Sequence, residues 1–261
     1  MIITSLMNKK SGLIIGVANI NSLAWNITCN VLNQGAVVAL TYYSSINKKR
    51  ILSLLKNINI SIVLPCDVSN DEEIKYVFKV LKYRWGVLDF LLHSISYVNN
   101  KGLQGKYLTI SRRSFIRALD INCFSFTTIS RYASYIMNFG GSILTLTYFG
   151  AKSVIPFYNV MGVAKSALEA SVRYLANDLG CYNIRVNALS LGPVKTLSSL
   201  KIREFNSILN YYKLITPMYR NITFSDISGS SIYFLSNLSS GVTGEIHNVD
   251  CGYQIMGIKY Y

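Results

Sequence analysis

The chain has 261 residues, of which 51% are hydrophobic and only 15% are charged. This composition excludes an intrinsically disordered protein, and the length suffices for one large α/β domain with a substantial core. The mean hydropathy of +0.30 raises the question of a membrane protein, but the sequence contains no uninterrupted apolar stretch of about 18 residues.

The N-terminus and the cysteines indicate the compartment. Lys9 and Lys10 follow the first apolar residues instead of preceding them, so the N-terminus does not resemble a signal peptide. The five cysteines are scattered, odd in number and without Cys-x-x-Cys spacing, which is typical of reduced thiols in a protein core. We therefore expect a cytoplasmic protein without stable membrane insertion. No group of His, Cys and Asp residues has the spacing of metal ligands, so we expect no metal site.

The formal net charge of +14 admits three interpretations. Lysine, asparagine, isoleucine and tyrosine are all abundant, as expected when a strongly AT-biased genome fills permissive surface positions. Alternatively, the charge attracts an acidic partner protein. Nucleic acid is not favoured, because the sequence has no arginine-rich tail and no repeat of aromatic and basic residues. The first two interpretations both remain open at this stage.

Strand-like and helix-like segments alternate along the whole chain, which is typical of a parallel sheet with helices on both faces. In chain order, short apolar runs predict strands at residues 13–15, 37–42, 60–64, 90–92, 142–146, 184–189 and 245–249. The segments between them predict helices at residues 22–33, 44–56, 71–83, 111–137, from Tyr158 through Lys165 to about 179, and 226–235. No linker, repeat or low-complexity tract divides the chain. The fold class is therefore α/β, with residues 1–261 as one Rossmann-like domain around a doubly wound parallel sheet of about seven strands.

The turn after the first predicted strand suits a phosphate group. Gly16 follows the strand, and Ser22-Leu23-Ala24 begins the next helix. A dinucleotide-binding fold holds its pyrophosphate at this place, with free backbone amides and the positive end of the helix dipole. Ser22 can cap the helix and offer its hydroxyl to phosphate. The segment lacks the G-x-G-x-x-G fingerprint, so a plain strand-to-helix turn is the alternative.

Two polar segments follow later strands at the carboxyl edge of the predicted sheet, where ligands bind in open α/β folds. Asp67-Val68 follows the third strand, and the carboxylate either accepts from an adenine amine or forms a turn. His93-Ser94-Ile95-Ser96 ends the fourth strand. His93 is a candidate catalytic residue there, although a single histidine at a strand end is more often structural.

The spacing of Tyr158 and Lys165 is the most informative signal in the sequence. Residues seven apart on a helix are separated by almost two turns, so both side chains would lie on one face, about 10 Å apart in rise. A long lysine there can reach back toward the tyrosine. Since a fixed ammonium near a phenol favours the phenolate, we predict a lowered pKa for Tyr158 and a role as proton donor near neutral pH.

A set of short segments spread over nearly the whole chain adds to this pair. They are Gly16-Val17-Ala18 with Ser22-Leu23-Ala24, Cys66-Asp67-Val68, His93-Ser94-Ile95, residues 144–151, residues 156–165, Arg185-Val186-Asn187, residues 191–197 and residues 249–252. Together they resemble the short-chain dehydrogenase/reductase superfamily and, more closely, its divergent branch of bacterial enoyl-acyl-carrier-protein reductases. The most specific part is the trio of Tyr148, Tyr158 and Lys165. Mainstream members of the superfamily have a serine where this chain offers Thr145, Thr147 and Tyr148.

The resemblance implies a reaction and a set of catalytic residues. NADH would deliver hydride to the β-carbon of a trans-2-enoyl thioester in the fatty acid elongation cycle. Tyr158 would hydrogen-bond the thioester oxygen and stabilise the enolate. Lys165 would hold the nicotinamide ribose and support the tyrosine, while Tyr148 would line the pocket and assist protonation. Val98, Tyr148 and Tyr158 would contact the substrate.

The resemblance also implies where the cofactor and the acyl chain lie. Residues 192–198 would cross the cofactor, and residues 199–217 would form a flap over the acyl chain, within a flap region near 195–220. The implied cofactor-binding residues are Gly16, Ser22, Leu23, Tyr43, Asp67, Val68, Ser94, Ile95, Lys165, Val194, Lys195, Thr196, Leu197 and Ser198. Two positions depart from the branch, which usually has glycine where Ser96 stands and a polar residue where Tyr43 stands.

The implied partners are an acyl carrier protein that bears the enoyl chain and further copies of this chain in a homotetramer. The carrier protein is acidic, and the flap region that it would approach is basic. This region contains Lys195, Lys201, Arg203, Lys213 and Arg220 against one acid, Glu204. The resemblance favours NADH over NADPH, although the nearby Lys48, Lys49 and Arg50 are able to attract a 2′-phosphate.

Two other functions remain open from the sequence. The first is a 3-ketoacyl or other carbonyl reductase of the same superfamily, against which the missing serine argues. The second is a non-catalytic nucleotide-binding scaffold. Such proteins usually lose the active tyrosine or lysine, and this chain keeps both Tyr158 and Lys165.

Overall fold

The computed structural model describes residues 5–60, 62–98, 105–197 and 199–257. Within these residues, seven parallel strands form one sheet in the order β3-β2-β1-β4-β5-β6-β7. The strands are β1 Ser11–Ile15, β2 Val37–Tyr42, β3 Ile62–Pro65, β4 Phe90–His93, β5 Gly141–Tyr148, β6 Ile184–Leu191 and β7 Ile246–Val249. The predicted α/β class and doubly wound parallel sheet are confirmed. The chain reverses its winding direction between β1 and β4, which is where such folds bind ligands.

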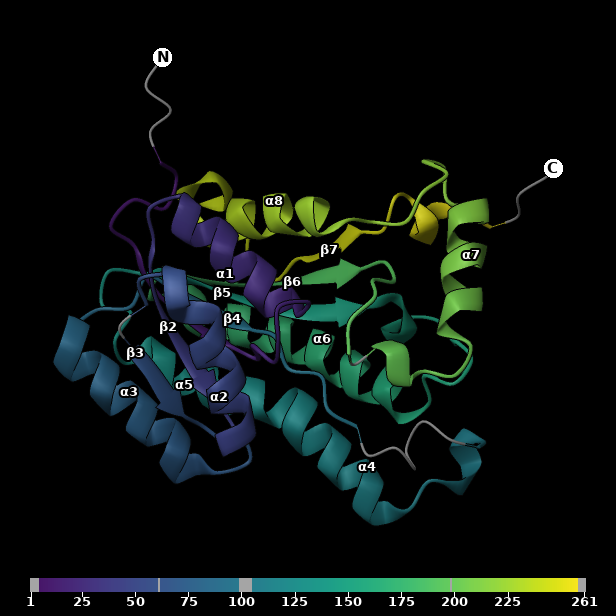
Figure 1. Ribbon diagram of the computed structural model, residues 1–261, viewed down its shortest axis with the longest axis horizontal. Helices are drawn as coiled ribbons and strands as arrows, with labels where there is room; N and C mark the ends of the chain where they lie inside the picture. The colour runs from purple at the N-terminus through teal and green to yellow at the C-terminus, as the bar shows by residue number, and fades with distance from the viewer. Residues whose placement is uncertain (1–4, 61, 99–104, 198, 258–261) are drawn as a thin grey trace.

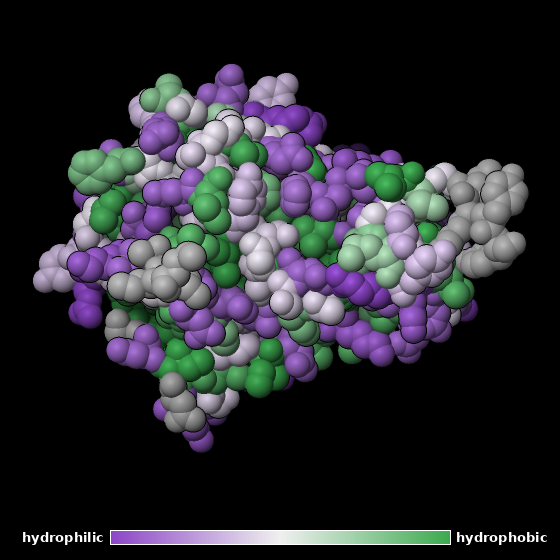
Figure 2. Space-filling view, turned by 90° about the horizontal axis from the view of Figure 1, so that it is seen from above, coloured by the Kyte–Doolittle hydropathy of each residue, from purple (hydrophilic) through white to green (hydrophobic). Residues whose placement is uncertain are grey.

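Helices cover both faces of the sheet (Figure 1). One face carries α1 (Leu23–Asn33), α2 (Ser45–Leu54) and α8 (Phe224–Leu235), and the other carries α3 (Asp71–Trp85), α5 (Ser125–Ser134) and α6 (Val160–Gly180). On the face with α1 and α8, the outer side chains are a mixture of hydrophilic and hydrophobic (Figure 2). This mixture is expected for amphipathic helices whose apolar stripes pack on the sheet.

The strands are apolar on both sides because both of their faces are covered. In β1, Leu13 and Ile15 pack into the core with α3, α5 and α6, whereas Ile14 packs into the core with α1, α2 and α8. Two further helices lie toward the carboxyl edge, α4 (Arg112–Leu119) and α7 (Phe205–Ile215). In Figure 1, α7 stands beyond the ends of β5 and β6. Within the described residues, no helix is both long enough and apolar enough to cross a membrane.

Several boundaries of helices and strands differ from those predicted from the sequence. The predicted helix over residues 111–137 is α4, a π-helical turn at Asp120–Phe124 and then α5. The segment predicted only as a flap contains α7. The third strand begins at Ile62 instead of residue 60, and β5 extends to Tyr148.

The predicted helical placement of Tyr158 is wrong. The helix α6 begins at Val160, so Tyr158 precedes it. The neighbours of the tyrosine explain the late start, because Phe157 and Asn159 have positive φ angles of 65° and 44°. Positive φ is uncommon for residues other than glycine, and such backbone strain concentrates at functional sites. Tyr158 therefore lies in a strained turn and not on the same helical face as Lys165.

Candidate active site

A large cavity of about 690 Å³ lies at the carboxyl edge of the sheet. It is lined by segments that follow β1, β2, β3, β4, β5 and β6, and by residues of α6. Most of the predicted site residues line it: Gly16, Ser22, Leu23, Tyr43, Asp67, Val68, Ser94, Ile95, Val98, Tyr148, Tyr158, Lys165, Val194, Thr196 and Leu197. Lys195 is exposed and does not line the cavity, and Ser198 lies outside the described residues.

The turn after β1 approaches the neighbouring strand end closely. Gly16 has a φ of 107°, and a Cβ atom built on it would lie 2.0 Å from the carbonyl oxygen of Ser94. Only glycine fits this position. Ser22 caps α1, because its Oγ accepts from the amide of Trp25 at 3.3 Å. The other amides of the first turn have no partner inside the helix, which suits an anion such as a pyrophosphate.

Asn47 was missed by the sequence analysis. Its side chain is only 3% exposed. The Nδ2 group donates to the carbonyl of Val17 at 3.0 Å, and Oδ1 accepts from the amide of Tyr43 at 3.2 Å. Asn47 thereby connects the loop after β1 to the loop after β2, and it also lines the cavity. The sequence contains no signal for this contact beyond a polar residue near the start of a predicted helix.

Asp67 lines the cavity and also forms a turn. Its Oδ1 accepts from the backbone amide of Ser69 at 2.9 Å and from the hydroxyl of Ser69 at 2.7 Å. The other carboxylate oxygen, Oδ2, retains acceptor capacity toward the cavity. Both interpretations from the sequence, turn former and ligand acceptor, are therefore compatible with the structure.

Lys165 is a buried cation that lines the cavity. Its side chain is 4% exposed, and Nζ donates to the carbonyl of Leu146 at 2.9 Å and to that of Ile95 at 3.2 Å. Burial lowers the pKa of Lys165 to about 8. An ammonium has three donors, so one remains for a ligand in the cavity. This donor, together with the glycine turn and the amides of α1, fits the hydroxyls and phosphates of a dinucleotide.

Tyr158 packs edge-on against Tyr148, with ring centroids 5.0 Å apart. Gly150 makes room for it, since a Cβ atom there would lie 2.5 Å from Tyr158 Cδ1. The predicted lowering of the Tyr158 pKa is wrong. Burial raises this pKa, and the nearby Tyr148 and Glu169 raise it further. Tyr158 is therefore a neutral phenol, whose hydroxyl is able to donate a hydrogen bond to a ligand.

Tyr148 is held by residues that the sequence analysis did not single out. Its hydroxyl lies 3.3 Å from that of Tyr212 in α7, and Tyr212 stacks on Tyr253 with ring centroids 3.8 Å apart. Burial raises the pKa of Tyr148 to about 12. With 19 tyrosines in the chain, no local pattern distinguishes Tyr212 from the others.

His93 is structural. It is fully buried, and its ring nitrogens lie 3.1 Å from Thr145 Oγ1 and 3.0 Å from Ser125 Oγ. Burial lowers the pKa of His93 to about 3, so the imidazole is neutral at physiological pH. It does not line the cavity. The residue joins β4, β5 and α5 behind the site instead of acting in it.

Comparison with known proteins agrees with this geometry. Residues 16–254 match the family model described as Enoyl-(Acyl carrier protein) reductase. The chain is 48% identical over 254 residues to the enoyl-acyl-carrier-protein reductase (NADH) FabI of Rickettsia bellii, and the match covers 97% of each chain. It has a TM-score of 0.94 and 50% identity to the solved reductase of Anaplasma phagocytophilum in complex with NAD, with 98% of each chain covered.

A second solved relative is the enoyl-acyl carrier protein reductase of Bacillus cereus with NADP⁺ and indole naphthyridinone. It has a TM-score of 0.94 and 42% identity, and the match covers 97% of this chain and 99% of that one. The doubly wound sheet, with a cavity at its carboxyl edge that Tyr148, Tyr158 and Lys165 line, is thus accompanied by nearly full-length similarity to these enzymes. The chain belongs to the enoyl-acyl-carrier-protein reductase family.

Proposed function

We propose that this protein reduces the trans-2 double bond of an enoyl chain on acyl carrier protein with NADH, in the fatty acid elongation cycle. The observation that carries the proposal is that one cavity is lined both by a candidate cofactor site and by candidate catalytic residues. The turn at Gly16 and the start of α1 form the first, and Tyr158 and Lys165 form the second. The relative from Rickettsia bellii is named as an NADH-dependent enoyl-acyl-carrier-protein reductase, and the relative from Anaplasma phagocytophilum was solved with NAD. Both support the proposal.

The catalytic roles follow from the protonation states. NADH, when bound, supplies the hydride that goes to the β-carbon of the substrate. Tyr158 is a neutral phenol, so its hydroxyl donates to the thioester oxygen and stabilises the negative charge that develops there. Lys165 offers its remaining N–H to the nicotinamide ribose and holds positive charge near the reacting oxygen. Tyr148 and Val98, which pack against the cluster of Tyr158 and Met161, shape the space for the acyl chain.

The remaining contacts hold the two ends of the cofactor. We assign the pyrophosphate to the amides of residues 16–23 and to Ser22, and the adenosine to Tyr43, Asp67 and Val68. Ser94 and Ile95 would lie against the nicotinamide half, and Val194, Thr196 and Leu197 would cross it. Lys195 is left out of this assignment because its side chain is exposed outside the cavity.

The direct test is the oxidation of NADH with two substrates. We expect turnover with a crotonyl or longer enoyl thioester and little with an acetoacetyl thioester. Preference for the acetoacetyl thioester would favour a ketoacyl reductase. Binding of NADH without turnover of either substrate would favour a non-catalytic scaffold.

We expect NADH to be preferred over NADPH, and Arg50 to determine how strongly. Arg50 lines the cavity, whereas Lys48 stacks over the ring of Tyr42 at 5.4 Å and Lys49 does not line the cavity. Arg50 is therefore the cation best placed for a 2′-phosphate. Arg50→Ala should reduce kcat/KM for NADPH about tenfold and leave that for NADH nearly unchanged, with Lys49→Ala as the control. Equal or better wild-type turnover with NADPH would contradict the preference.

The acyl carrier protein is proposed to approach the basic flap region. Two of its five cations are engaged within the chain, since Arg220 pairs with Asp226 at 2.6 Å and Arg203 contacts Glu204 at 3.4 Å. Lys195 and Lys213 are exposed and form no ion pair within the described residues, while the side chain of Lys201 lies outside the description. We therefore expect Lys195 and Lys213 to contribute most to docking.

Added salt should separate carrier docking from catalysis. Charge complementarity mainly accelerates encounter and is screened over about 10 Å at 0.1 M salt. We expect kcat/KM for the carrier-linked substrate to fall with salt much more steeply than that for a coenzyme A thioester. The double variant Lys195→Ala/Lys213→Ala should flatten the steep curve. The same salt dependence for both wild-type substrates would reject a docking role for the flap.

The remaining proposals concern assembly and location. We propose that residues 1–261 act as one NAD-binding domain with a flap near 195–220, and that the protein is a homotetramer. Several apolar side chains are exposed, including Phe124 at 56%, Tyr174 at 76% and Ile255 at 70%, which supports burial between copies. The sequence from Ile255 to Tyr261 forms an apolar C-terminal tail, and its last four residues lie outside the described residues. Sedimentation equilibrium would measure the assembly.

A cytoplasmic location is proposed because all five cysteines are free thiols.

A further inference from the structure

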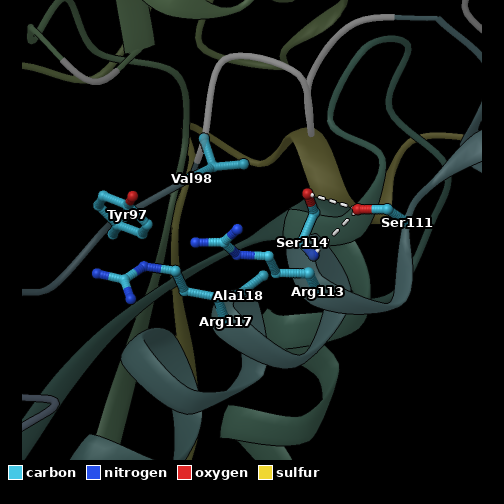
Figure 3. A pocket seen from close by; sticks show the side chains of 7 residues that line it. All are labelled: Tyr97, Val98, Ser111, Arg113, Ser114, Arg117 and Ala118. Atoms are coloured by element: carbon cyan, nitrogen blue, oxygen red, sulfur yellow. Dashed lines mark hydrogen bonds between the residues drawn. The ribbon is translucent and has the colours of Figure 1, made fainter.

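A second cavity of about 550 Å³ lies beside the active-site cavity (Figure 3). It is bounded by Tyr97 and Val98, which follow β4, and by residues along α4 from its N-cap Ser111 to Ala118. Figure 3 shows Arg113 and Arg117 extending from α4 toward the space beside these two residues. Tyr97, Val98 and Arg117 line both cavities, so the two cavities are neighbours.

The second cavity has positive charge without a protein counter-charge. Arg113 and Arg117 are one helical turn apart, and like charges at this spacing repel. Its lining residues include no carboxylate, and neither arginine forms an ion pair within the described residues. No acidic residue occupies the first turn of α4, so the helix dipole adds to the positive potential near Arg113. A bound anion would relieve this repulsion.

The wall opposite the arginines is fixed by a buried amide. Asn122 lies in the π-helical turn after α4 and is fully buried. Its Oδ1 accepts from the amide of Tyr97 at 2.8 Å, and its Nδ2 donates to the carbonyls of Tyr97 at 2.6 Å and Ala118 at 2.8 Å. The guanidinium of Arg117 in turn lies 5.5 Å from the centre of the Tyr97 ring. Tyr97 and α4 therefore form one connected frame for the cavity.

The position of the cavity indicates which anion it suits. Val98 packs against the cluster formed by Tyr158 and Met161, so the second cavity adjoins the proposed substrate end of the site. If the proposed function holds, the substrate is a thioester of a pantetheine arm, and a phosphate group terminates that arm in both acyl carrier protein and coenzyme A. Two guanidinium groups on adjacent turns are well suited to a phosphate, because each can donate two hydrogen bonds.

We propose that Arg113 and Arg117 bind the phosphate of the pantetheine arm that carries the enoyl chain. This proposal rests on the proposed reductase function and adds a binding site for the carrier arm next to it. The arm would pass Val98 on its way from the reacting thioester to the two arginines. The site would bind the phosphate group that acyl carrier protein and coenzyme A share. Its residues are separate from the flap region.

The experiment compares two substrates that differ only in the phosphate, an enoyl-4′-phosphopantetheine and the corresponding enoyl-pantetheine. We expect the wild-type protein to favour the phosphorylated substrate about tenfold in kcat/KM, mainly through KM. Arg113→Gln should abolish most of this ratio, and Arg117→Gln should also reduce it. Arg112→Gln is the matched control, because Arg112 is exposed on the same helix, has the same charge and does not line the cavity. It should keep the wild-type ratio.

Several results would overturn the proposal. One is an equal loss in Arg113→Gln and Arg112→Gln, which would indicate a general charge effect. Another is a rise in KM for NADH or NADPH instead of for the thioester in Arg113→Gln, which would assign the arginines to the cofactor. A loss confined to carrier-protein substrate, absent with coenzyme A and phosphopantetheine thioesters, would indicate protein docking.

Binding without turnover separates this proposal from the proposed function. Calorimetric titration of the NADH complex with 4′-phosphopantetheine and with pantetheine should show about tenfold tighter binding of the phosphorylated compound, lost in Arg113→Gln. Equal binding of both compounds to the wild type would reject the phosphate site. Failure to reduce any enoyl thioester would reject the reductase function, and the binding result would still decide whether the phosphate site exists. Thermal unfolding of each variant verifies that it is folded.

Discussion

Tyr158→Phe is expected to lower kcat about a hundredfold while KM for NADH changes little. The phenylalanine keeps the ring that packs on Tyr148 and removes only the hydroxyl. Loss of one donor to a developing oxyanion typically costs about 3 kcal/mol in the transition state. Since burial keeps the phenol of Tyr158 neutral, the wild-type hydroxyl is available as a donor across the physiological pH range. Steady-state kinetics with an enoyl thioester and a fluorescence titration of NADH binding measure the two effects.

Tyr148→Phe is the matched control for this variant. It also removes one hydroxyl from the same aromatic pair, but that hydroxyl contacts Tyr212 of the protein. We expect a decrease in kcat of less than about tenfold, because a hydrogen bond between neutral groups contributes roughly 1 kcal/mol. If Tyr158→Phe retains wild-type kcat, or if Tyr148→Phe is the more damaging change, the assignment of Tyr158 as the oxyanion donor is wrong.

Lys165→Ala is expected to damage both catalysis and cofactor binding. Its ammonium is bonded to the carbonyls of Leu146 and Ile95, and one donor remains for a ligand in the cavity that Lys165 lines. Removing it should lower kcat about a hundredfold and raise KM for NADH about tenfold, because hydrogen bonds from charged groups are stronger than those between neutral ones. Lys152→Ala is the control, since this lysine is exposed and does not line the cavity. Loss of kcat alone, with normal NADH binding, would contradict the ribose contact.

The pH dependence of NADH binding provides an independent test of Lys165. Burial lowers the pKa of this lysine to about 8, so the ammonium is fully present below that pH and is lost as the pH rises through it. The KM for NADH should therefore rise above about pH 8. In Lys165→Arg the charge persists beyond pH 12, and the rise should disappear. A flat wild-type profile up to pH 10 would show that the lysine keeps its proton or does not contact the cofactor.

The sheet could be predicted from the sequence because its strands are buried on both faces. Their uninterrupted apolar runs, such as Leu13-Ile14-Ile15, alternate with amphipathic helices, a pattern typical of a parallel sheet covered on both faces. The location of most site residues followed as well, since the carboxyl ends of parallel strands meet at one edge. These features depend on local sequence and on the topology of the sheet.

The features that could not be predicted depend on contacts between distant segments. Asn47 acts through the carbonyl of Val17, and Tyr212 acts through Tyr148, and neither partner is visible from the local pattern. The positive φ angles of Phe157 and Asn159 flank Tyr158, whose ring packs closely against Gly150. The sign of the Tyr158 pKa change also depended on burial, which raises this pKa and which the spacing of Tyr158 and Lys165 does not indicate.

The stack of Tyr212 on Tyr253 has a consequence for the evolution of acyl specificity. The wall behind Tyr148 is assembled from β5, α7 and a short turn at Tyr253–Ile255, near the end of the chain. Phe149 also packs edge-on against Tyr253, with ring centroids 5.0 Å apart. If the proposed function holds, changes at Tyr253 would reach the wall behind the acyl chain through Tyr212 and Tyr148, while Tyr158 and Lys165 stay in place. Under that function, selection for membranes of a different lipid composition would act on this terminal segment and leave the residues of the hydride transfer unchanged.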